Sequence, residues 1–291
     1  MNALLYGVVT LIWGSTWLAI KYQLGVVAPE ASVAYRFALA ALFLFGWSIA
    51  RGMPLRYKLK DHFFMALLGA LMFSTNYVLF YIAESHLTSG LVAIIFSIAL
   101  FMNIGNKMLF FRQTVKPSVL LGATFGLAGI TFVFWRELVS FSLDSSSGRG
   151  IALSLAGTLL FSFGNMVSAR NQRVGLPIIQ STAYGMAYGA ALLTIFALLF
   201  GIDLKLDMSF AYLSSLIYLA LFGSVIGFGC YLTLLGRIGA ERAAYATVLT
   251  PVIALGLSTL FERFTWTLQA VVGVCLILIG NVVVLRKPKA A

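Results

Sequence analysis

Near the start of the chain, two indoles and a hydroxyl group lie inside an apolar stretch. The segment LIWGSTWLAIKYQ, residues 11 to 23, contains Trp13, Thr16 and Trp17. Because an α-helix turns once in about 3.6 residues, these three side chains share one helix face. Such a face either packs against a neighbouring helix or binds a small molecule by non-covalent contacts. A simple membrane anchor would need only aliphatic residues, and Trp normally prefers the membrane interface.

Amide and phenol side chains in other apolar stretches extend this set of candidate residues. Asn76 stands beside Tyr77, and Asn103 and Asn165 lie in two further stretches. An amide inside hydrocarbon must find hydrogen-bond partners, so each one either joins helices or belongs to a polar site. We predict a solute-binding site that contains Trp13, Thr16, Trp17, Asn76, Tyr77, Asn103, Asn165, Tyr231 and Tyr245.

The titratable residues argue against a proton relay inside the membrane. The apolar stretches contain no Asp or Glu at mid-depth, and buried carboxylates commonly carry such relays. Glu84 and His86, at the expected outer end of their helix, are the nearest titratable pair. His changes its charge at about pH 6.5, which makes this pair the candidate for coupling to a proton gradient. Exchange of one solute for another would need neither residue.

Arg36 is a charged residue inside an apolar stretch, six positions after Glu30. This spacing corresponds to roughly 9 Å along a helix. An Arg side chain at that depth reaches water or an acidic partner. We therefore expect Arg36 to extend to the outer surface or to pair with Glu30 or Glu84.

The residue types exclude several other functions. With two His, no H-E-x-x-H motif and no acidic cluster, a metal-dependent hydrolase would lack ligands. We predict that the protein is not an enzyme and has neither a metal site nor a cofactor. The net charge of +11 is dispersed over short connections rather than gathered in a stripe, which argues against nucleic acid as a partner. The expected partners are a small-molecule solute and membrane lipid, and both a monomer and a homodimer remain open.

The elements that must position these residues are membrane-spanning helices. Hydrophobic residues make up 61% of the chain, charged residues make up 10%, and the mean hydropathy is +0.98. A water-soluble domain cannot bury this much apolar surface, so we predict an all-α integral membrane protein. A spanning helix needs about 20 mostly apolar residues. Ten stretches qualify, namely 3–21, 30–50, 62–83, 88–109, 117–135, 150–169, 177–200, 210–235, 240–261 and 266–285.

Lys and Arg in the connections predict the orientation. One alternate set of connections and the C-terminal tail contain fourteen Lys and Arg residues, whereas the other set contains five. Positive residues are enriched on the cytoplasmic side of membrane proteins. We therefore expect a multi-pass protein of the cell (inner) membrane with both termini in the cytoplasm.

The two halves of the chain resemble each other. Pro29 and Pro177 begin similar segments 148 residues apart, Tyr81 and Tyr231 are 150 apart, and the glycines of GATFGLAG, at 122 and 129, recur 151 residues later. We divide the chain into a five-helix repeat at 1–138, an extracytoplasmic linker at 139–149 and a second five-helix repeat at 150–291. An odd number of spans makes the second repeat enter the membrane from the opposite side, so the repeat is inverted.

Several motifs also resemble a known family. LIWGSTWLAIK followed by YRFALAAL, and IGAERAAYATVLTPVIALGLSTLFERFTW in the second half, are similar to the drug/metabolite transporter superfamily, in particular to its EamA-type bacterial permeases. The resemblance implies a ten-helix carrier with cytoplasmic termini and a central cavity. The first half departs from the pattern, because Phe101 and Arg112-Gln113 stand where the second half has Pro251 and Glu262-Arg263.

These observations predict a secondary transporter that works by alternating access. A mostly apolar cavity with scattered amides and aromatic rings suits a small uncharged or zwitterionic amphipathic metabolite, such as an amino acid or a related compound, moved by export. A polyanion would need more buried basic residues. The alternatives are a membrane channel, which would need rings of polar residues along a pore, and a membrane scaffold or assembly protein that transports nothing.

Overall fold

The computed structural model describes residues 2–25, 27–87, 92, 95–112, 114, 117–139, 145–261 and 266–285. Every regular element in this part of the chain is a helix, as the sequence predicts. The helices are α1 (Asn2–Lys21), α2 (Pro29–Ala50), α3 (Leu59–Met72), α4 (Thr75–Glu84), α6 (Ala99–Phe111), α7 (Pro117–Val133), α8 (Trp135–Val139), α9 (Ser145–Arg173), α10 (Ile178–Leu199), α11 (Phe210–Tyr218), η1 (Leu219–Ile226), α12 (Gly227–Ile238), α13 (Ala240–Phe261) and α14 (Leu268–Leu285).

Length and hydropathy identify this chain as an integral membrane protein. Five helical segments of the described chain are long and apolar enough to cross a membrane. They are Pro29–Ala50, Leu59–Glu84, Ser146–Arg173, Ile178–Leu199 and Phe210–Ile238. Shorter apolar helices cover Ile95–Phe111, Pro117–Val133 and Leu268–Val284. The all-α membrane class is thus confirmed, whereas the count of ten spans and the inverted repeat stay predictions.

Two of the long apolar segments are interrupted, which the sequence analysis did not predict. Between α3 and α4, Ser74 leaves the helical conformation with φ −147° and ψ −86°. Its hydroxyl oxygen lies 3.1 and 3.0 Å from the carbonyl oxygens of Gly69 and Ala70, which share its single hydrogen at the break. In the second half, the π-helix η1 separates α11 from α12. Wide turns of this kind are frequent at functional sites.

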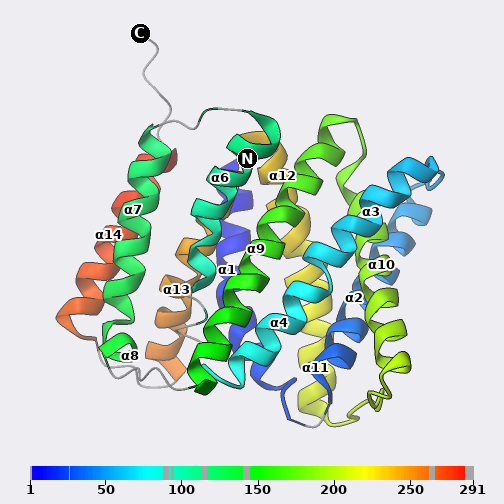
Figure 1. The fold of residues 1–291 in the computed structure, drawn as a ribbon, viewed down its shortest axis with the longest axis horizontal. Coiled ribbons are helices and arrows are strands. Elements are labelled where there is room, and N and C mark those ends of the chain that lie inside the picture. The colour runs from blue at the N-terminus through cyan, green and yellow to red at the C-terminus, as the bar shows by residue number, and fades with distance from the viewer. Residues whose placement is uncertain are drawn as a thin grey trace.

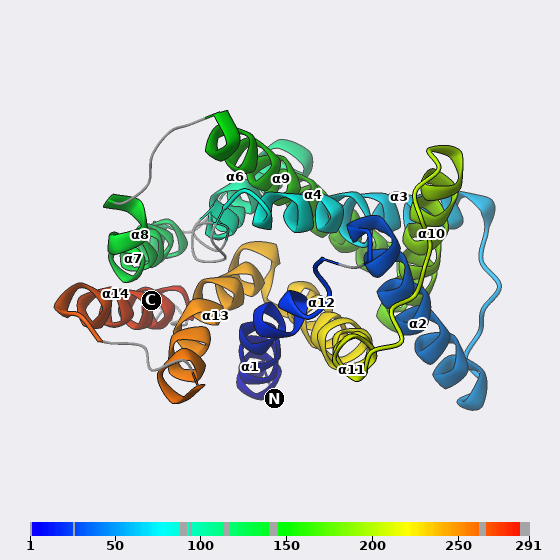
Figure 2. The same cartoon turned by 90° about the horizontal axis from the view of Figure 1, so that it is seen from below.

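Two pairs of helices close the ends of the bundle. Figures 1 and 2 show α7 beside α14 at one end of the long axis and α2 beside α10 at the other, and both pairs are in contact. Glycines allow the backbones to approach closely. In the α7–α14 pair, a Cβ atom at Gly129 would lie 2.6 Å from the carbonyl oxygen of Gly273, and one at Gly122 would lie 2.7 Å from that of Gly280. Small residues at helix crossings are typical of membrane bundles.

The remaining helices form two rows between these end pairs. Seen along the bundle in Figure 2, α1, α12 and α13 lie on one side and α4, α6 and α9 on the other. Within one row α9 packs on α3, α4 and α6, and within the other α1 packs on η1, α12 and α13. The two rows meet where α6 packs on α13 and α9 packs on α12 and α13. The start of α1 and the end of α14 both lie at the top of the bundle in the view of Figure 1. Each row combines helices from both halves of the chain, so the space between the rows has walls from both halves.

Candidate functional site

A small cavity lies between the two rows of helices, with a volume of about 60 Å³. This is room for a few water molecules and much less than a typical ligand pocket, so a solute of the size of an amino acid would need the walls to move apart. Its walls come from α1, α2, α4, α9, α12 and α13, and aromatic rings dominate them. The lining residues are Trp13, Thr16, Ile20, Arg36, Asn76, Tyr77, Phe80, Tyr81, Glu84, Phe96, Phe161, Phe228 and Thr250.

Trp13 is held in the cavity wall by the opposite half of the chain. Its indole nitrogen donates to the carbonyl oxygen of Gly223 at 3.2 Å. The ring packs on Phe228 and Tyr231, with centroid distances of 5.0 and 4.8 Å. Thr16 lines the same wall, and its hydroxyl group donates a hydrogen bond to the carbonyl oxygen of Trp13 at 2.9 Å. The side chain of Trp17 lies outside the described residues.

Asn76 and Tyr77 stand in the first turn of α4, directly after the break at Ser74, and both line the cavity. Asn76 is 1% exposed, and its amide oxygen has no hydrogen-bond partner among the described residues. The ring of Tyr77 packs edge-on against Phe37 at a centroid distance of 5.0 Å. The break in the helix thus presents an unpartnered acceptor beside an aromatic wall.

Arg36 lines the cavity from α2 and is 2% exposed. The expectation that this side chain reaches water at the outer surface is wrong, because α4 and η1 cover it. Its Nε donates to the hydroxyl oxygen of Ser224 in η1 at 3.0 Å. The guanidinium carbon lies 4.9 Å from the ring centroid of Tyr77. An ion pair with Glu30 or Glu84 stays a prediction.

Asn103 and Asn165 belong to a buried cluster beside the cavity rather than to its lining. Both are 0% exposed. The hydroxyl group of Ser162 donates to Asn103 Oδ1 at 2.7 Å, and Asn165 Nδ2 donates to the same oxygen at 3.3 Å. Asn106 Nδ2 donates to Ser162 Oγ at 2.8 Å. We call these four residues the amide cluster, and it joins α6 to α9.

Tyr231 packs against the cavity wall from behind and does not line the cavity itself. It is 0% exposed and lies between Trp13 and Phe161, whose ring centroids are 4.8 and 5.8 Å away. The structure therefore places Tyr231 directly behind two lining residues. Three rings from α1, α9 and α12 meet at this point.

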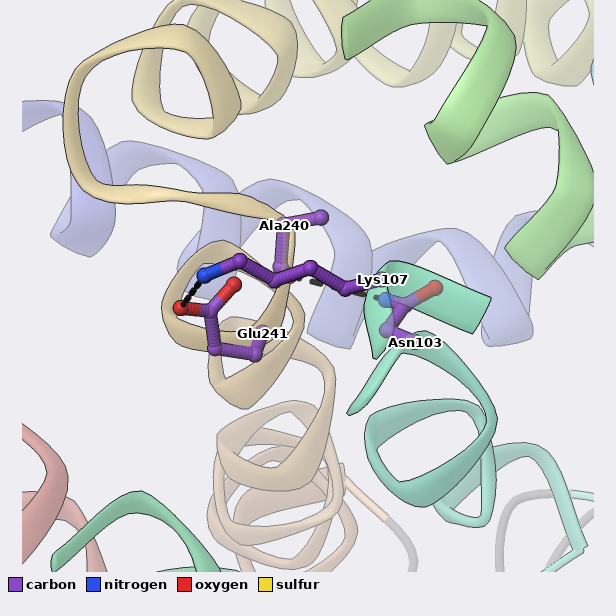
Figure 3. Close-up of polar contacts among 4 residues, drawn as sticks. All are labelled: Asn103, Lys107, Ala240 and Glu241. Atoms are coloured by element: carbon purple, nitrogen blue, oxygen red, sulfur yellow. Dashed lines mark hydrogen bonds and ion pairs between the residues drawn. The ribbon is translucent and has the colours of Figure 1, made fainter. Parts of the chain in front are cut away.

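A second, larger cavity of about 390 Å³ lies beyond the amide cluster, and we call it the vestibule. Lys107, Met166, Arg173 and Leu235 are among its lining residues. At its wall, Lys107 Nζ forms an ion pair with Glu241 Oε1 at 2.6 Å (Figure 3).

The ion pair of the vestibule joins α6 to the start of α13. The same helices are joined one turn earlier, where Asn103 Nδ2 lies 3.5 Å from the carbonyl oxygen of Ala240 (Figure 3). Both side chains of the pair are largely buried, at 17% and 8% exposure. The carboxylate of Glu241 also lies in the first turn of α13, where it is favoured by the helix dipole.

Of the remaining predicted residues, Tyr245 and His86 lie outside the cavity lining, whereas Glu84 belongs to it. The hydroxyl group of Tyr245 donates to the carbonyl oxygens of Gly122 and Ile277, at 3.1 and 3.3 Å. Tyr245 thus lies where α13 meets α7 and α14. Of the coupling candidates, Glu84 lines the cavity, whereas His86 Nδ1 contacts the hydroxyl group of Ser146 at 3.0 Å.

Sequence reasoning missed several lining residues. Phe161 had a usable signal, because the repeat aligns it with Trp13 at the same offset of 148 residues that separates Pro29 from Pro177. Tyr81 could also have been found, because the repeat aligns it with Tyr231, which was among the predicted site residues. Ile20 and Phe80 had the signal of helix periodicity, because each lies four positions after a predicted site residue, Thr16 and Asn76. The remaining lining residues carry no such pattern in the sequence: they are Phe96, Phe228 and Thr250.

The fold and the site together define a class of protein. A helical membrane protein with an internal cavity, walls from both halves of the chain and interrupted helices at that cavity has the organisation of a membrane transporter. Among the described residues no group of three or more His, Cys, Asp or Glu is arranged to hold a metal ion.

Comparison with known proteins agrees with this class. The model of the EamA-like transporter family matches residues 1–135 and 148–286, so the chain belongs to this family. The chain is 26% identical to the "Uncharacterized transporter YoaV" of Bacillus subtilis, over 94% of this chain and 92% of that protein. It is 27% identical to the "Uncharacterized inner membrane transporter YedA" of Escherichia coli K12, over 97% and 92%.

A solved structure shares the fold. It is described as "Crystal structure of protein", has a TM-score of 0.81 and is 18% identical in sequence. The similarity covers 98% of this chain and 96% of the other. This likeness shows the fold alone. The family match at 1–135 and 148–286 and the transporter relatives confirm the resemblance drawn from the sequence motifs, and the chain is a membrane transporter of the EamA-like family.

Proposed function

We propose that the protein is a secondary transporter that exports a small zwitterionic or uncharged amphipathic metabolite, such as an amino acid, across the inner membrane. The observation that carries this proposal is the central cavity, whose walls combine aromatic rings with a few buried polar groups. Aromatic walls suit the apolar part of such a solute. Arg36, Asn76 and Thr16 suit its polar part.

Alternating access follows from an inverted repeat of two five-helix halves. The two family matches, at 1–135 and 148–286, support this division of the chain. The pairing of helices supports it as well, since α2 packs on α10 and α7 on α14, each at the same position in its own half. Rocking of one half against the other would open the cavity to each side in turn.

In the present conformation the cavity has room for only a few water molecules. The amide cluster separates the cavity from the vestibule, and along α9 the two are bounded by Phe161 and Met166. These residues are five positions apart, or roughly 7.5 Å along the helix. The vestibule lies among the connections rich in Lys and Arg, so we assign it to the cytoplasmic side, with both termini.

Counterflow in proteoliposomes tests the proposal. Purified protein is reconstituted into vesicles loaded with an unlabelled amino acid such as L-leucine or L-phenylalanine, and uptake of the radiolabelled compound is followed. A carrier gives saturable uptake that depends on the solute inside. Unsaturable flux would indicate a channel, and absence of flux for a broad panel of metabolites would favour a scaffold.

A further inference from the structure

Arg36 is a cation buried in the wall of the central cavity. Its side chain is 2% exposed, and its helix α2 contributes no other lining residue. A charged side chain at membrane depth is costly unless other groups compensate it, and such residues commonly mark the path of a substrate. The contacts of the guanidinium group therefore show which of its nitrogen atoms still lacks a hydrogen-bond partner.

The described contacts of Arg36 leave one of its nitrogen atoms without a hydrogen bond. Nε donates to Ser224 Oγ at 3.0 Å. The planar faces lie near Phe37 and Tyr77, with 5.4 and 4.9 Å between the guanidinium carbon and the ring centroids. Nη1 is buried and has no hydrogen-bond partner among the described residues. The side chains of Tyr77 and Tyr81 line the same cavity beside this guanidinium group.

The π-helix η1 fixes the orientation of this guanidinium group. Ser224 donates its own hydroxyl hydrogen to the carbonyl oxygen of Leu219 at 3.0 Å, which leaves its oxygen free to accept from Arg36. Gly223 makes room, because a Cβ atom there would lie 3.1 Å from Arg36 Nη2. The carbonyl oxygen of Gly223 also holds Trp13. One turn of η1 thus positions both an aromatic and a cationic group at the cavity.

We infer that Arg36 binds the carboxylate of the transported solute, an inference that rests on the proposed function. A guanidinium group with a fixed Nε and a free Nη1 matches a carboxylate oxygen, and charge-assisted hydrogen bonds of this kind are strong. The rings of Trp13 and Phe228 contact the apolar part. The unpartnered Asn76 Oδ1, which lines the same cavity, suits an ammonium group. The solute class is narrowed to amphipathic carboxylates, with α-amino acids as the leading members.

Matched ligands test this assignment on the purified full-length protein. L-leucine and L-phenylalanine are compared with L-leucinamide and L-phenylalaninamide, which keep the apolar and ammonium groups but lack the negative charge. A ligand that binds the folded state raises the melting temperature by an amount that grows with the ratio of its free concentration to its Kd. We expect the carboxylates to bind at least about tenfold more tightly than the amides, because a charged hydrogen bond is lost.

Three variants assign the preference to Arg36. Arg36→Gln should abolish the discrimination between carboxylate and amide, and Arg36→Lys should retain it in weakened form because Lys lacks the fork geometry. Arg51→Gln makes the same change at the exposed C-terminal end of the same helix and should leave the discrimination intact. If Arg36→Gln does not fold, Ser224→Ala keeps the charge, removes its positioning acceptor and should reduce the discrimination several-fold.

The outcomes separate this inference from the proposed function. Equal binding of carboxylates and amides by the wild-type protein, or no response to any carboxylate, would overturn the assignment of Arg36. Counterflow of a solute without a carboxylate would overturn it while leaving the transporter proposal intact. Absence of counterflow, together with carboxylate-dependent stabilisation that is lost in Arg36→Gln, would support the binding site and contradict transport.

Discussion

Single side chains at the centre of this protein are held by groups from the other half of the chain. Gly223 accepts the indole hydrogen of Trp13, and Ser224 accepts from Arg36. Ser162 likewise donates to Asn103. These contacts are buried, where an unpaired polar group is costly. A substitution at such a position therefore acts on both the removed group and the partner that it leaves behind.

Asn103→Ala should destabilise the protein. It leaves Ser162 Oγ and Asn165 Nδ2 without their shared acceptor, and losing one buried partner costs about 1–3 kcal/mol. The free energy of unfolding, measured in detergent, should fall by this amount, and counterflow should slow because the barrier between cavity and vestibule is altered. Asn2→Ala, at an exposed position, is the control. An Asn103→Ala protein with wild-type stability would contradict the amide cluster.

At the scale of helices, the ion pair between Lys107 and Glu241 should join α6 to α13. A double-mutant cycle with Lys107→Met and Glu241→Gln should give a coupling free energy of about 0.5–3 kcal/mol, as expected for residues in direct contact. The pair Lys205–Asp203, with side chains 85% and 60% exposed, is the control and should show no resolvable coupling. If the two substitutions changed the free energy of unfolding additively, the side chains of Lys107 and Glu241 would not interact, which would contradict the ion pair.

The close crossing of α3 and α10 predicts an asymmetry between glycines. Gly69→Ala would push a Cβ atom into the backbone of Gly185 and Gly189, and overpacking of this kind costs about 1–3 kcal/mol. Gly46→Ala, on the open face of α2 with nothing within 4 Å, should instead stabilise the helix by about 0.5–1 kcal/mol. Thermal unfolding of both variants checks this, and equal melting temperatures would refute the crossing.

The helical class was predictable from the sequence because long apolar runs favour helices, and the observed ends of α2 and α10 lie within one residue of the predicted ones. By contrast, α9 begins at Ser145, inside the predicted linker 139–149, and ends at Arg173, four residues after the predicted span 150–169. The interruptions were not predictable, because the break at Ser74 and the turn of η1 depend on contacts with other helices. The same cause explains the error at Arg36, whose burial is set by α4 and η1 rather than by its depth along α2. Tyr245 resembled a cavity residue by type alone, and its hydrogen bonds to α7 and α14 were not readable from its position.

At the scale of the whole molecule, the charge bias predicts which ends of the helices face the cytoplasm. The test uses a variant without Cys230 and Cys275, into which single cysteines are introduced. The connection 51–60 is rich in Lys and Arg and should therefore face the cytoplasm, so the Lys58→Cys variant should not react with an impermeant thiol reagent added to intact cells. Lys205→Cys, in the connection after α10, should react. The reverse pattern would invert the proposed topology.

Transport through the central cavity is tested most directly by the initial rate of counterflow for Trp13→Ala, measured with Trp47→Ala as the matched control. Trp13 lines the cavity and is 8% exposed, whereas Trp47 is 54% exposed on the outer face of α2. We predict that Trp13→Ala lowers the rate at least about tenfold, a loss within the range of a buried aromatic contact, and that Trp47→Ala retains the wild-type rate. A wild-type rate for Trp13→Ala at equal reconstitution would contradict transport through this cavity.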